Sequence, residues 1–282
     1  MKPDTTTIAT ITVAHSPDSD DAFMFYGLAS GKLETGGIEV KQVHKDIQTL
    51  NIEAKEELYD ISAISFGAYP EVCNSYALLS SGASIGFKYG PILIASTSLK
   101  LEELPKLTIA VPGLQTTACL VLNLYCPGLN LVALPFNQIM DAVETGQVDA
   151  GLLIHEGQLT YVDRQFHKLL DLGQWWFEET GLPLPLGGNA IRKGLGTDMT
   201  QKVSRLMQDS VIYSLAHRAK ALDYAMGFAP GLPQKLTDEY ISMYVNDFTV
   251  DLGPLGRQAL QRLYGMAFEK RLIPQPVELE IV

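Results

Sequence analysis

Short apolar runs of β type alternate along most of the chain with stretches whose apolar residues recur at helical spacing. In the first part of the sequence, strands are expected at residues 8–15, 38–43 and 59–67, with helices at residues 22–29 and 46–57. The same order recurs later, with strands expected at residues 107–111, 129–134 and 148–154 and helices at residues 118–125 and 136–145. Such alternation predicts mostly parallel sheets with helices on their faces. Because the order is used twice, we interpret the chain as two similar β-α-β-α-β units.

Two apolar, extended segments, residues 89–96 and 182–191, are bounded by Gly or Pro. We interpret them as paired crossover strands that form a hinge and let two lobes close on a ligand. From residue 197 onward the pattern is helical, and these helices are expected to pack on the first lobe. The predicted fold is therefore a two-lobed α/β protein. One lobe comprises residues 1–95 and 192–282, the inserted lobe comprises residues 96–191, and the ligand cleft lies between them.

The composition narrows the class of protein and of partner. The formal net charge is -11 and no basic run occurs, which argues against a nucleic-acid partner. No apolar run approaches the roughly 20 residues of a membrane-spanning helix, and the first residues do not resemble a signal peptide. We therefore expect a cytoplasmic protein with no membrane partner. Cys73, Cys119 and Cys126 lack the spacing of a zinc site and are odd in number, so reduced core thiols are expected.

His155 directly follows an apolar strand, at the position where ligands bind in parallel sheets. One interpretation is a structural histidine that caps a turn. The other is a general base, because a neighbouring helix N-terminus disfavours the imidazolium and keeps the ring able to accept a proton. Glu156 could orient this ring or simply be solvated. The same rule brings His155 close to residues 16–21, Ser65 and the turn at residues 116–117.

Hydroxyl side chains stand at two other strand ends. Thr116 and Thr117 precede a predicted helix, where they either cap it or, together with free N–H groups, form an anion site suited to a carboxylate. Ser65 has the same two interpretations. Gly67 would allow a close approach of the backbone, and the backbone of Ala63 and Ile64 would then line the cleft.

An acidic turn contains Asp18, Asp20 and Asp21. It resembles a metal-binding turn, but the glycine and the distal glutamate of a calcium loop are missing. A capped, solvated turn is therefore expected, with Asp21 as a candidate ligand-binding residue and with no metal. The glycine-rich segments match neither the phosphate-binding loop nor the dinucleotide fingerprint, so that no cofactor is implied.

Several segments together resemble the 1,4-dihydroxy-6-naphthoate synthase family of the futalosine route to menaquinone. They are residues 16–26, 46–51, 110–118, 151–156 and 180–187. The resemblance runs from about Thr12 to Phe248, and the Ile-His-Glu and Leu-Pro-Leu-Pro-Leu-Gly segments are its most specific parts. Some members of the family carry Pro-Asn-Asp where this chain has Ser19-Asp20-Asp21.

The resemblance implies a type II periplasmic-binding-protein-like fold that has become a cytoplasmic enzyme. It implies a carbon-carbon lyase that needs no cofactor and splits cyclic dehypoxanthinyl futalosine, an aromatic carboxylate, to 1,4-dihydroxy-6-naphthoate. By the resemblance, His155 is the proton acceptor. The implied substrate contacts are Ala63, Ile64, Ser65, Thr116, Thr117 and Ala118.

Three other functions share this fold or its cleft. A non-catalytic solute-binding protein for a small carboxylate would carry a secretion signal or a lipid-attachment cysteine. Chorismate dehydratase, the sister enzyme of the same pathway, would use a related cleft, and the segment around His155 favours the synthase. A ligand-sensing regulatory module would normally be joined to a DNA-binding or signalling domain. The sequence leaves the oligomeric state open between a monomer and a homodimer.

Overall fold

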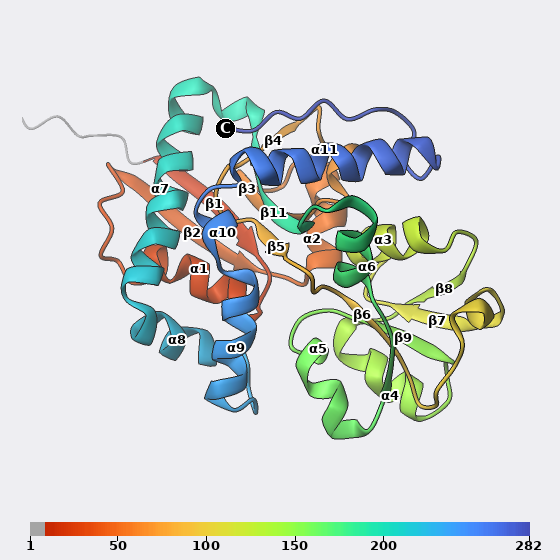
Figure 1. Cartoon of the computed structure of the whole chain (residues 1–282). Helices are drawn as coiled ribbons and strands as arrows, with labels where there is room; N and C mark the ends of the chain where they lie inside the picture. The colour runs from red at the N-terminus through yellow and green to blue at the C-terminus, as the bar shows by residue number, and fades with distance from the viewer. Residues whose placement is uncertain (1–8) are drawn as a thin grey trace, which may run out of the picture.

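The computed structural model describes residues 9–282, which form two α/β units side by side (Figure 1). The first sheet has the order β2-β1-β3-β11-β4, and β5 pairs with β11. Its strands are β1 (Ala9–His15), β2 (Ile38–His44), β3 (Ile61–Ser65), β4 (Tyr76–Leu78), β5 (Ser84–Gly86) and β11 (Leu184–Arg192). Residue 8, where the first strand was expected to begin, lies outside the described residues.

The second sheet has the order β10-β6-β9-β7-β8. Its strands are β6 (Ile92–Ala95), β7 (Thr108–Val111), β8 (Asn130–Ala133), β9 (Ala150–Leu153) and β10 (His167–Asp171). In each sheet, three strands form a parallel core, β2-β1-β3 in the first and β8-β7-β9 in the second. These cores are the two predicted β-α-β-α-β units. The remaining pairs within the sheets are antiparallel, which hydrophobic patterning could not reveal because it carries no information on strand direction.

Helices cover both units in the order that the periodicity predicted. Those of the two repeated units are α1 (Ser19–Ala29), α2 (Ile47–Glu53), α3 (Thr117–Tyr125) and α4 (Ile139–Glu144), followed by α5 (Gly157–Thr160) and α6 (Leu172–Thr180). The C-terminal helices are α7 (Thr197–Ala216), α8 (Arg218–Met226), α9 (Gln234–Tyr244), α10 (Asp247–Val250) and α11 (Gly253–Glu269). As predicted, α7, α8 and α9 pack against α1 of the first unit.

The two crossover segments do not pair with each other as strands, which corrects the predicted hinge. β6 pairs with β9 and β10 in the second sheet, whereas β11 pairs with β3, β4 and β5 in the first. The first segment instead packs against the second and against α6: a Cβ on Gly90 would lie 2.9 Å from Cδ2 of Leu184, and the Leu172 N–H donates to the Pro91 carbonyl at 2.9 Å. A Cβ on Gly173 would lie 2.0 Å from the Tyr89 carbonyl, so only glycine fits there. The predicted boundaries placed β6 in the first lobe and most of β11 in the second, but β6 belongs to the second sheet and β11 to the first. We therefore propose that the chain crosses between the lobes at residues 87–91 and 181–183.

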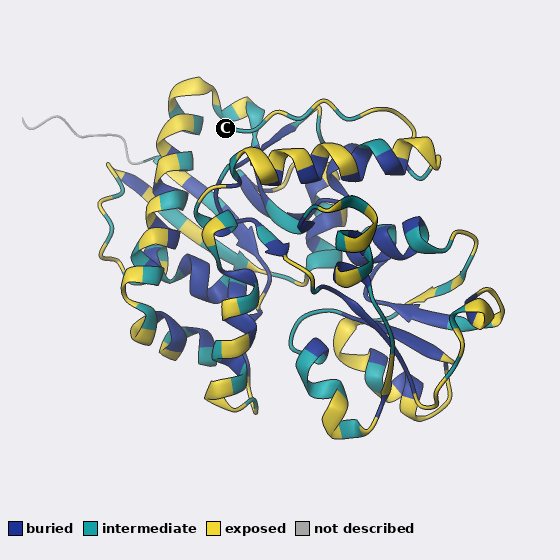
Figure 2. Ribbon diagram, in the orientation of Figure 1, coloured by how far each residue is buried: buried dark blue, intermediate teal, exposed yellow. Residues whose placement is uncertain are grey.

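The apolar core is continuous between the two units on one side of the molecule. One cluster of buried side chains includes Leu78 of the first sheet, Leu93 and Val111 of the second, Leu122 of α3 and Leu260 of α11. Figure 2 shows these strands buried and the outer faces of the helices exposed. The Lys270 ammonium, just after α11, also donates to a carbonyl of α3 at 2.6 Å. The units are therefore joined firmly along α3 and α11.

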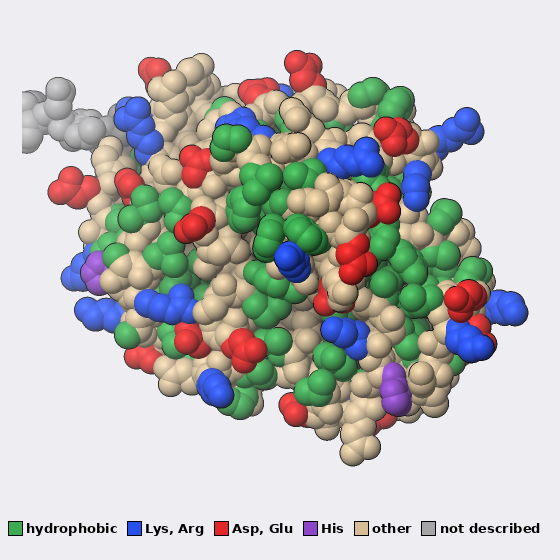
Figure 3. Space-filling view, in the orientation of Figure 1, with side chains coloured by type: hydrophobic (Ala, Val, Ile, Leu, Met, Phe, Trp, Pro, Cys, Tyr) green, Lys and Arg blue, Asp and Glu red, His purple; other side chains and the backbone are tan. Residues whose placement is uncertain are grey.

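Charge and cysteine usage can be compared with the sequence predictions directly. On the face shown in Figure 3, Lys and Arg side chains are interspersed with acidic ones and form no extended basic patch. All three cysteines are free thiols, with Cys119 buried and Cys73 and Cys126 half-buried, as expected. Within residues 9–282, no helix combines the length and the apolar character that crossing a bilayer requires.

Candidate active site

A cavity lies between the two units, and every predicted site residue lines it. These residues are Asp21 of α1, Ala63, Ile64 and Ser65 of β3, Thr116, Thr117 and Ala118 at the start of α3, and His155 after β9. They come together because the carboxyl ends of the parallel strands in both sheets face this space. The convergence that the sequence predicted is therefore present, although it does not by itself assign a role to any residue.

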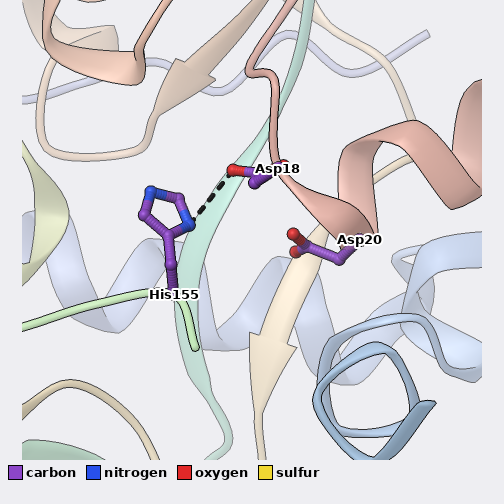
Figure 4. A group of neighbouring side chains, drawn as sticks. All are labelled: Asp18, Asp20 and His155. Carbon is purple, nitrogen blue, oxygen red and sulfur yellow. Dashed lines mark ion pairs between the residues drawn. The ribbon is translucent and has the colours of Figure 1, made fainter. Parts of the chain in front are cut away.

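His155 is held in an unusual position at the end of β9. Its backbone φ is +53°, a left-handed conformation that is uncommon outside glycine and costs on the order of 1 kcal/mol. Figure 4 shows Nδ1 of its ring facing Asp18, and the distance from Nδ1 to Oδ2 of Asp18 is 3.1 Å. The ring also packs edge-on against Phe136, with centroids 4.7 Å apart. Nε2 is buried and has no hydrogen-bond partner among the described residues.

The contact with Asp18 determines which nitrogen of a neutral His155 carries the hydrogen. A carboxylate can only accept, so Nδ1 must donate to it and the lone pair of the ring is then on Nε2. This contact joins the two lobes, because Asp18 precedes α1 and His155 follows β9. Glu156, for which the sequence left an orienting role or solvation open, accepts a hydrogen bond from the Ser19 hydroxyl at 2.5 Å.

The acidic turn is capped as predicted, but it is buried rather than solvated. The Asp18 side chain accepts from the Asp21 N–H at 3.3 Å and so caps α1. Asp18 and Asp20 are only 7% and 5% exposed. Burial, and after it the nearby charge of Asp18, raises the pKa values of Asp20 and Asp21 well above their usual range. The cost of burying these carboxyl groups indicates that the turn does more than cap a helix.

Asp18, Asp20 and His155 each offer one possible metal ligand, and these atoms lie within 4.8 Å of one another. The spacing within the acidic turn argued against a metal. It could not take account of His155, because this third possible ligand comes from the other lobe. The Asp18 and His155 atoms already contact each other at 3.1 Å. We therefore interpret the group as an acid-base pair with a neighbouring carboxyl group.

Ser65 is positioned by Asn51, a fully buried residue of α2 that sequence reasoning did not single out. The Asn51 side-chain amide donates to the Ser65 hydroxyl oxygen at 3.0 Å and accepts from the Ser65 backbone N–H at 2.9 Å. Because the hydroxyl oxygen already accepts from Asn51, its own hydrogen is free to point to a ligand. The only sequence signal for Asn51 was its place in the segment at residues 46–51 that resembles the synthase family.

The two threonine hydroxyls make hydrogen bonds within the protein, so their hydrogens are already engaged. Thr116 Oγ1 donates to the Gly113 carbonyl at 2.7 Å and accepts from the Cys119 N–H at 3.2 Å, as an N-cap does. Thr117 Oγ1 accepts from the Gly67 N–H at 2.9 Å and donates to the Leu186 carbonyl.

The start of α3 nevertheless keeps groups that suit an anion. The N–H groups of Thr117 and Ala118, its first two residues, have no acceptor within the helix. The positive end of the helix dipole adds to their attraction for a negative charge. No Lys or Arg occurs among the described residues that line the cavity. These N–H groups and the Ser65 hydroxyl are therefore uncharged donors that can hold an anionic group in this cavity.

Comparisons with known protein sequences identify the family of this chain. The profile of a family described as menaquinone biosynthesis matches residues 11–269. A 1,4-dihydroxy-6-naphthoate synthase of Thermus thermophilus is 37% identical over 262 residues, which cover 93% of this chain and 95% of that protein. A 1,4-dihydroxy-6-naphthoate synthase of Streptomyces coelicolor is 34% identical over 271 residues, which cover 94% of this chain and 95% of that protein.

Solved structures agree on the fold. A crystal structure of a protein from Archaeoglobus fulgidus is 43% identical, has a TM-score of 0.90 and is matched over 94% of this chain and 98% of that one. The alkanesulfonate-binding protein of Xanthomonas axonopodis pv. citri, bound to MOPS, has a TM-score of 0.73 at 13% identity, over 97% of this chain and 98% of that one. The second likeness shows the fold alone, and the periplasmic-binding-protein-like architecture expected from the sequence is confirmed.

Proposed function

The chain belongs to the 1,4-dihydroxy-6-naphthoate synthase family of menaquinone biosynthesis, and on this premise we propose how its cleft performs that reaction. The protein is an enzyme of menaquinone biosynthesis. The proposed reaction is a cofactor-independent carbon-carbon cleavage that converts cyclic dehypoxanthinyl futalosine to 1,4-dihydroxy-6-naphthoate. The observation that carries the proposed mechanism is the 3.1 Å contact of His155 Nδ1 with Asp18, which leaves Nε2 unpaired beside the cavity.

His155 is the general base of this mechanism. Its Nε2 removes a proton from the bound substrate, and cleavage of a carbon-carbon bond releases the sugar-derived fragment as the ring becomes aromatic. Asp18 is a positioning residue: it keeps the hydrogen on Nδ1 and stabilises the imidazolium that forms after proton transfer. The uncommon left-handed backbone of His155 supports this role, because such strain is typical of functional positions.

The substrate's aromatic carboxylate is held at the start of α3. The unpaired N–H groups of Thr117 and Ala118 and the Ser65 hydroxyl are the donors suited to a carboxylate in this cavity. Backbone donors at a helix start can hold an anion without a cationic side chain. This arrangement supports binding of a small anionic molecule by a chain whose net charge is -11.

Contacts between the lobes enclose the reacting end of the cavity. Besides the Asp18 contact with His155, the Tyr244 hydroxyl of α9 donates to the Gln158 side-chain oxygen of α5 at 2.6 Å. The Ser19 hydroxyl donates to Glu156 across the same gap. Closure of this kind excludes water, which strengthens the electrostatic interactions on which the base depends.

The decisive experiment is an assay of the purified protein with cyclic dehypoxanthinyl futalosine, with the naphthoate detected by chromatography. His155→Asn is the informative variant, because asparagine tolerates a left-handed backbone and can still contact Asp18. Its kcat should fall by about 100- to 10,000-fold, the usual contribution of a positioned base. A kcat within about fivefold of wild type would reject His155 as the base.

Two other outcomes would replace the proposal. Turnover of chorismate but not of the futalosine derivative would identify the sister enzyme, chorismate dehydratase. Tight binding of the aromatic carboxylate with no turnover of either compound would indicate a solute-binding protein.

A further inference from the structure

Two groups of polar residues in the cavity differ in hydrogen-bonding character. The donor group consists of the Ser65 hydroxyl and the N–H groups of Thr117 and Ala118. The acidic group consists of Asp18, Asp20 and Asp21 at the start of α1. The donors of the first group suit a carboxylate, whereas the carboxyl oxygens of the second group suit hydroxyl donors. The substrate's carboxylate and its uncharged, hydroxyl-bearing part must therefore bind to different walls of the cavity.

Within the acidic group, Asp20 alone has a buried oxygen with no partner. Asp18 contacts His155 and accepts from the Asp21 N–H, and Asp21 accepts from the Ser16 N–H at 2.9 Å. Asp20 is 5% exposed, and its Oδ1 has no hydrogen-bond partner among the described residues. Figure 4 shows its carboxyl group pointing from the start of α1 toward the space beside Asp18 and His155.

A buried polar atom without a partner is costly, and such atoms in native proteins generally serve a ligand or another function. The natural partner for a carboxyl oxygen is a hydroxyl donor. The sugar-derived fragment is the hydroxyl-bearing part of the proposed substrate, and it must lie beside His155 because the bond to this fragment is the one that breaks.

We propose that Asp20 accepts a hydrogen bond from a hydroxyl of the sugar-derived fragment and so selects and orients the substrate at His155. This inference rests on the proposed function and deepens it. Asp20 binds the part of the substrate that leaves and makes no contact with the aromatic carboxylate. The product naphthoate has lost that fragment, so it makes no use of Asp20.

The experiment compares substrate and product on the full chain. For Asp20→Ala, the KM for cyclic dehypoxanthinyl futalosine should rise by about 10- to 100-fold, the value of a hydrogen bond to a carboxyl group. The Kd of 1,4-dihydroxy-6-naphthoate, measured by calorimetry, should change by less than about twofold, since no contact with the product is lost. Asp20→Asn keeps an acceptor oxygen and should recover most of the loss in KM.

Ser65→Ala is the matched control, because it removes a donor to the carboxylate and should weaken substrate and product alike. Should Asp20→Ala not fold, the near-isosteric Asp20→Leu provides the same comparison. An unchanged KM in the variant that folds, or an equal loss for substrate and product, would overturn the assignment of Asp20. Wild-type protein that does not convert the futalosine derivative would overturn the proposed function itself, which is a different result.

Discussion

Replacing Asp18 by Asn tests whether Asp18 positions the base. Asparagine has nearly the shape of aspartate and is an equally good N-cap, so it keeps the hydrogen bond from the Asp21 N–H that starts α1. It differs at His155. The asparagine amide can donate to Nδ1, which places the ring hydrogen on Nε2, the atom that should accept the substrate's proton.

The expected loss follows from the 3.1 Å contact between Nδ1 and Asp18. The same replacement in the Ser-His-Asp triad lowers kcat by about 10,000-fold because the histidine adopts the wrong tautomer. Positioned acid-base catalysis contributes about 100- to 10,000-fold in general. We therefore expect kcat to fall by at least about 100-fold, or about 2.7 kcal/mol of transition-state stabilisation. KM should change little, because Asp18 does not belong to the donor group that holds the carboxylate.

Two measurements separate this role from a structural one. Glu156→Gln is the matched control, because Glu156 adjoins the base in sequence but contacts Ser19, and its kcat should stay near wild type. Nitrogen-15 NMR of histidine-labelled protein should show the hydrogen on Nδ1 of His155 in wild type and on Nε2 in Asp18→Asn. A kcat for Asp18→Asn within about fivefold of Glu156→Gln, or an unchanged tautomer, would refute the reasoning.

Three further predictions concern stability. Burial raises the pKa of Asp20, so the folded state binds the Asp20 proton more tightly than the unfolded chain does. The contribution of this group to the free energy of unfolding is therefore fully present below the unfolded pKa and is lost as the pH rises through the folded pKa. The Tm of Asp20→Asn should vary less with pH than the Tm of wild type, and identical slopes would contradict this. A Cβ at Gly67 would lie 3.0 Å from the Thr116 carbonyl. Gly67→Ala should therefore lower the free energy of unfolding in urea by about 1 kcal/mol and raise KM. An unaltered urea midpoint together with an unaltered KM would argue against a tight contact here. Tyr244→Phe leaves the Gln158 oxygen unpaired, so urea unfolding should show a loss of about 1 to 3 kcal/mol, and no loss would mean that the contact is absent in solution.

The sequence was most informative where one physical rule applied to both halves of the chain. The carboxyl ends of parallel strands must face the same edge of a sheet, which is why Ser65 at the end of β3, the start of α3 after β7 and His155 after β9 could be expected in one place. Gly67 was expected to allow a close approach, and its backbone does lie against the turn that starts α3. These predictions needed only the order of the elements.

Predictions failed where the answer depended on how the two lobes meet. Glu156 was the candidate to orient His155 because it is next in sequence, but the partner of the ring is Asp18 on the other lobe. The acidic turn was expected to be solvated for a similar reason, since its contacts with His155 and Glu156 of the second lobe cannot be read from the spacing within the turn. The threonine hydroxyls could be assigned neither to capping nor to a ligand, because both roles require the same residue at the same position of the helix.

The way in which the lobes meet links closure to chemistry under the proposed mechanism. On the side of α3 and α11 they share a continuous apolar core, which cannot open without exposing buried side chains to water (Figure 1). On the side of α9 and α5 they are joined through polar contacts, including those of Tyr244 with Gln158 and of His155 with Asp18, which water can replace at little cost. Opening to admit substrate should therefore occur on the polar side, and it separates His155 from Asp18. The base is then correctly oriented only when the lobes have closed, so proton abstraction waits until the substrate is enclosed and water is excluded.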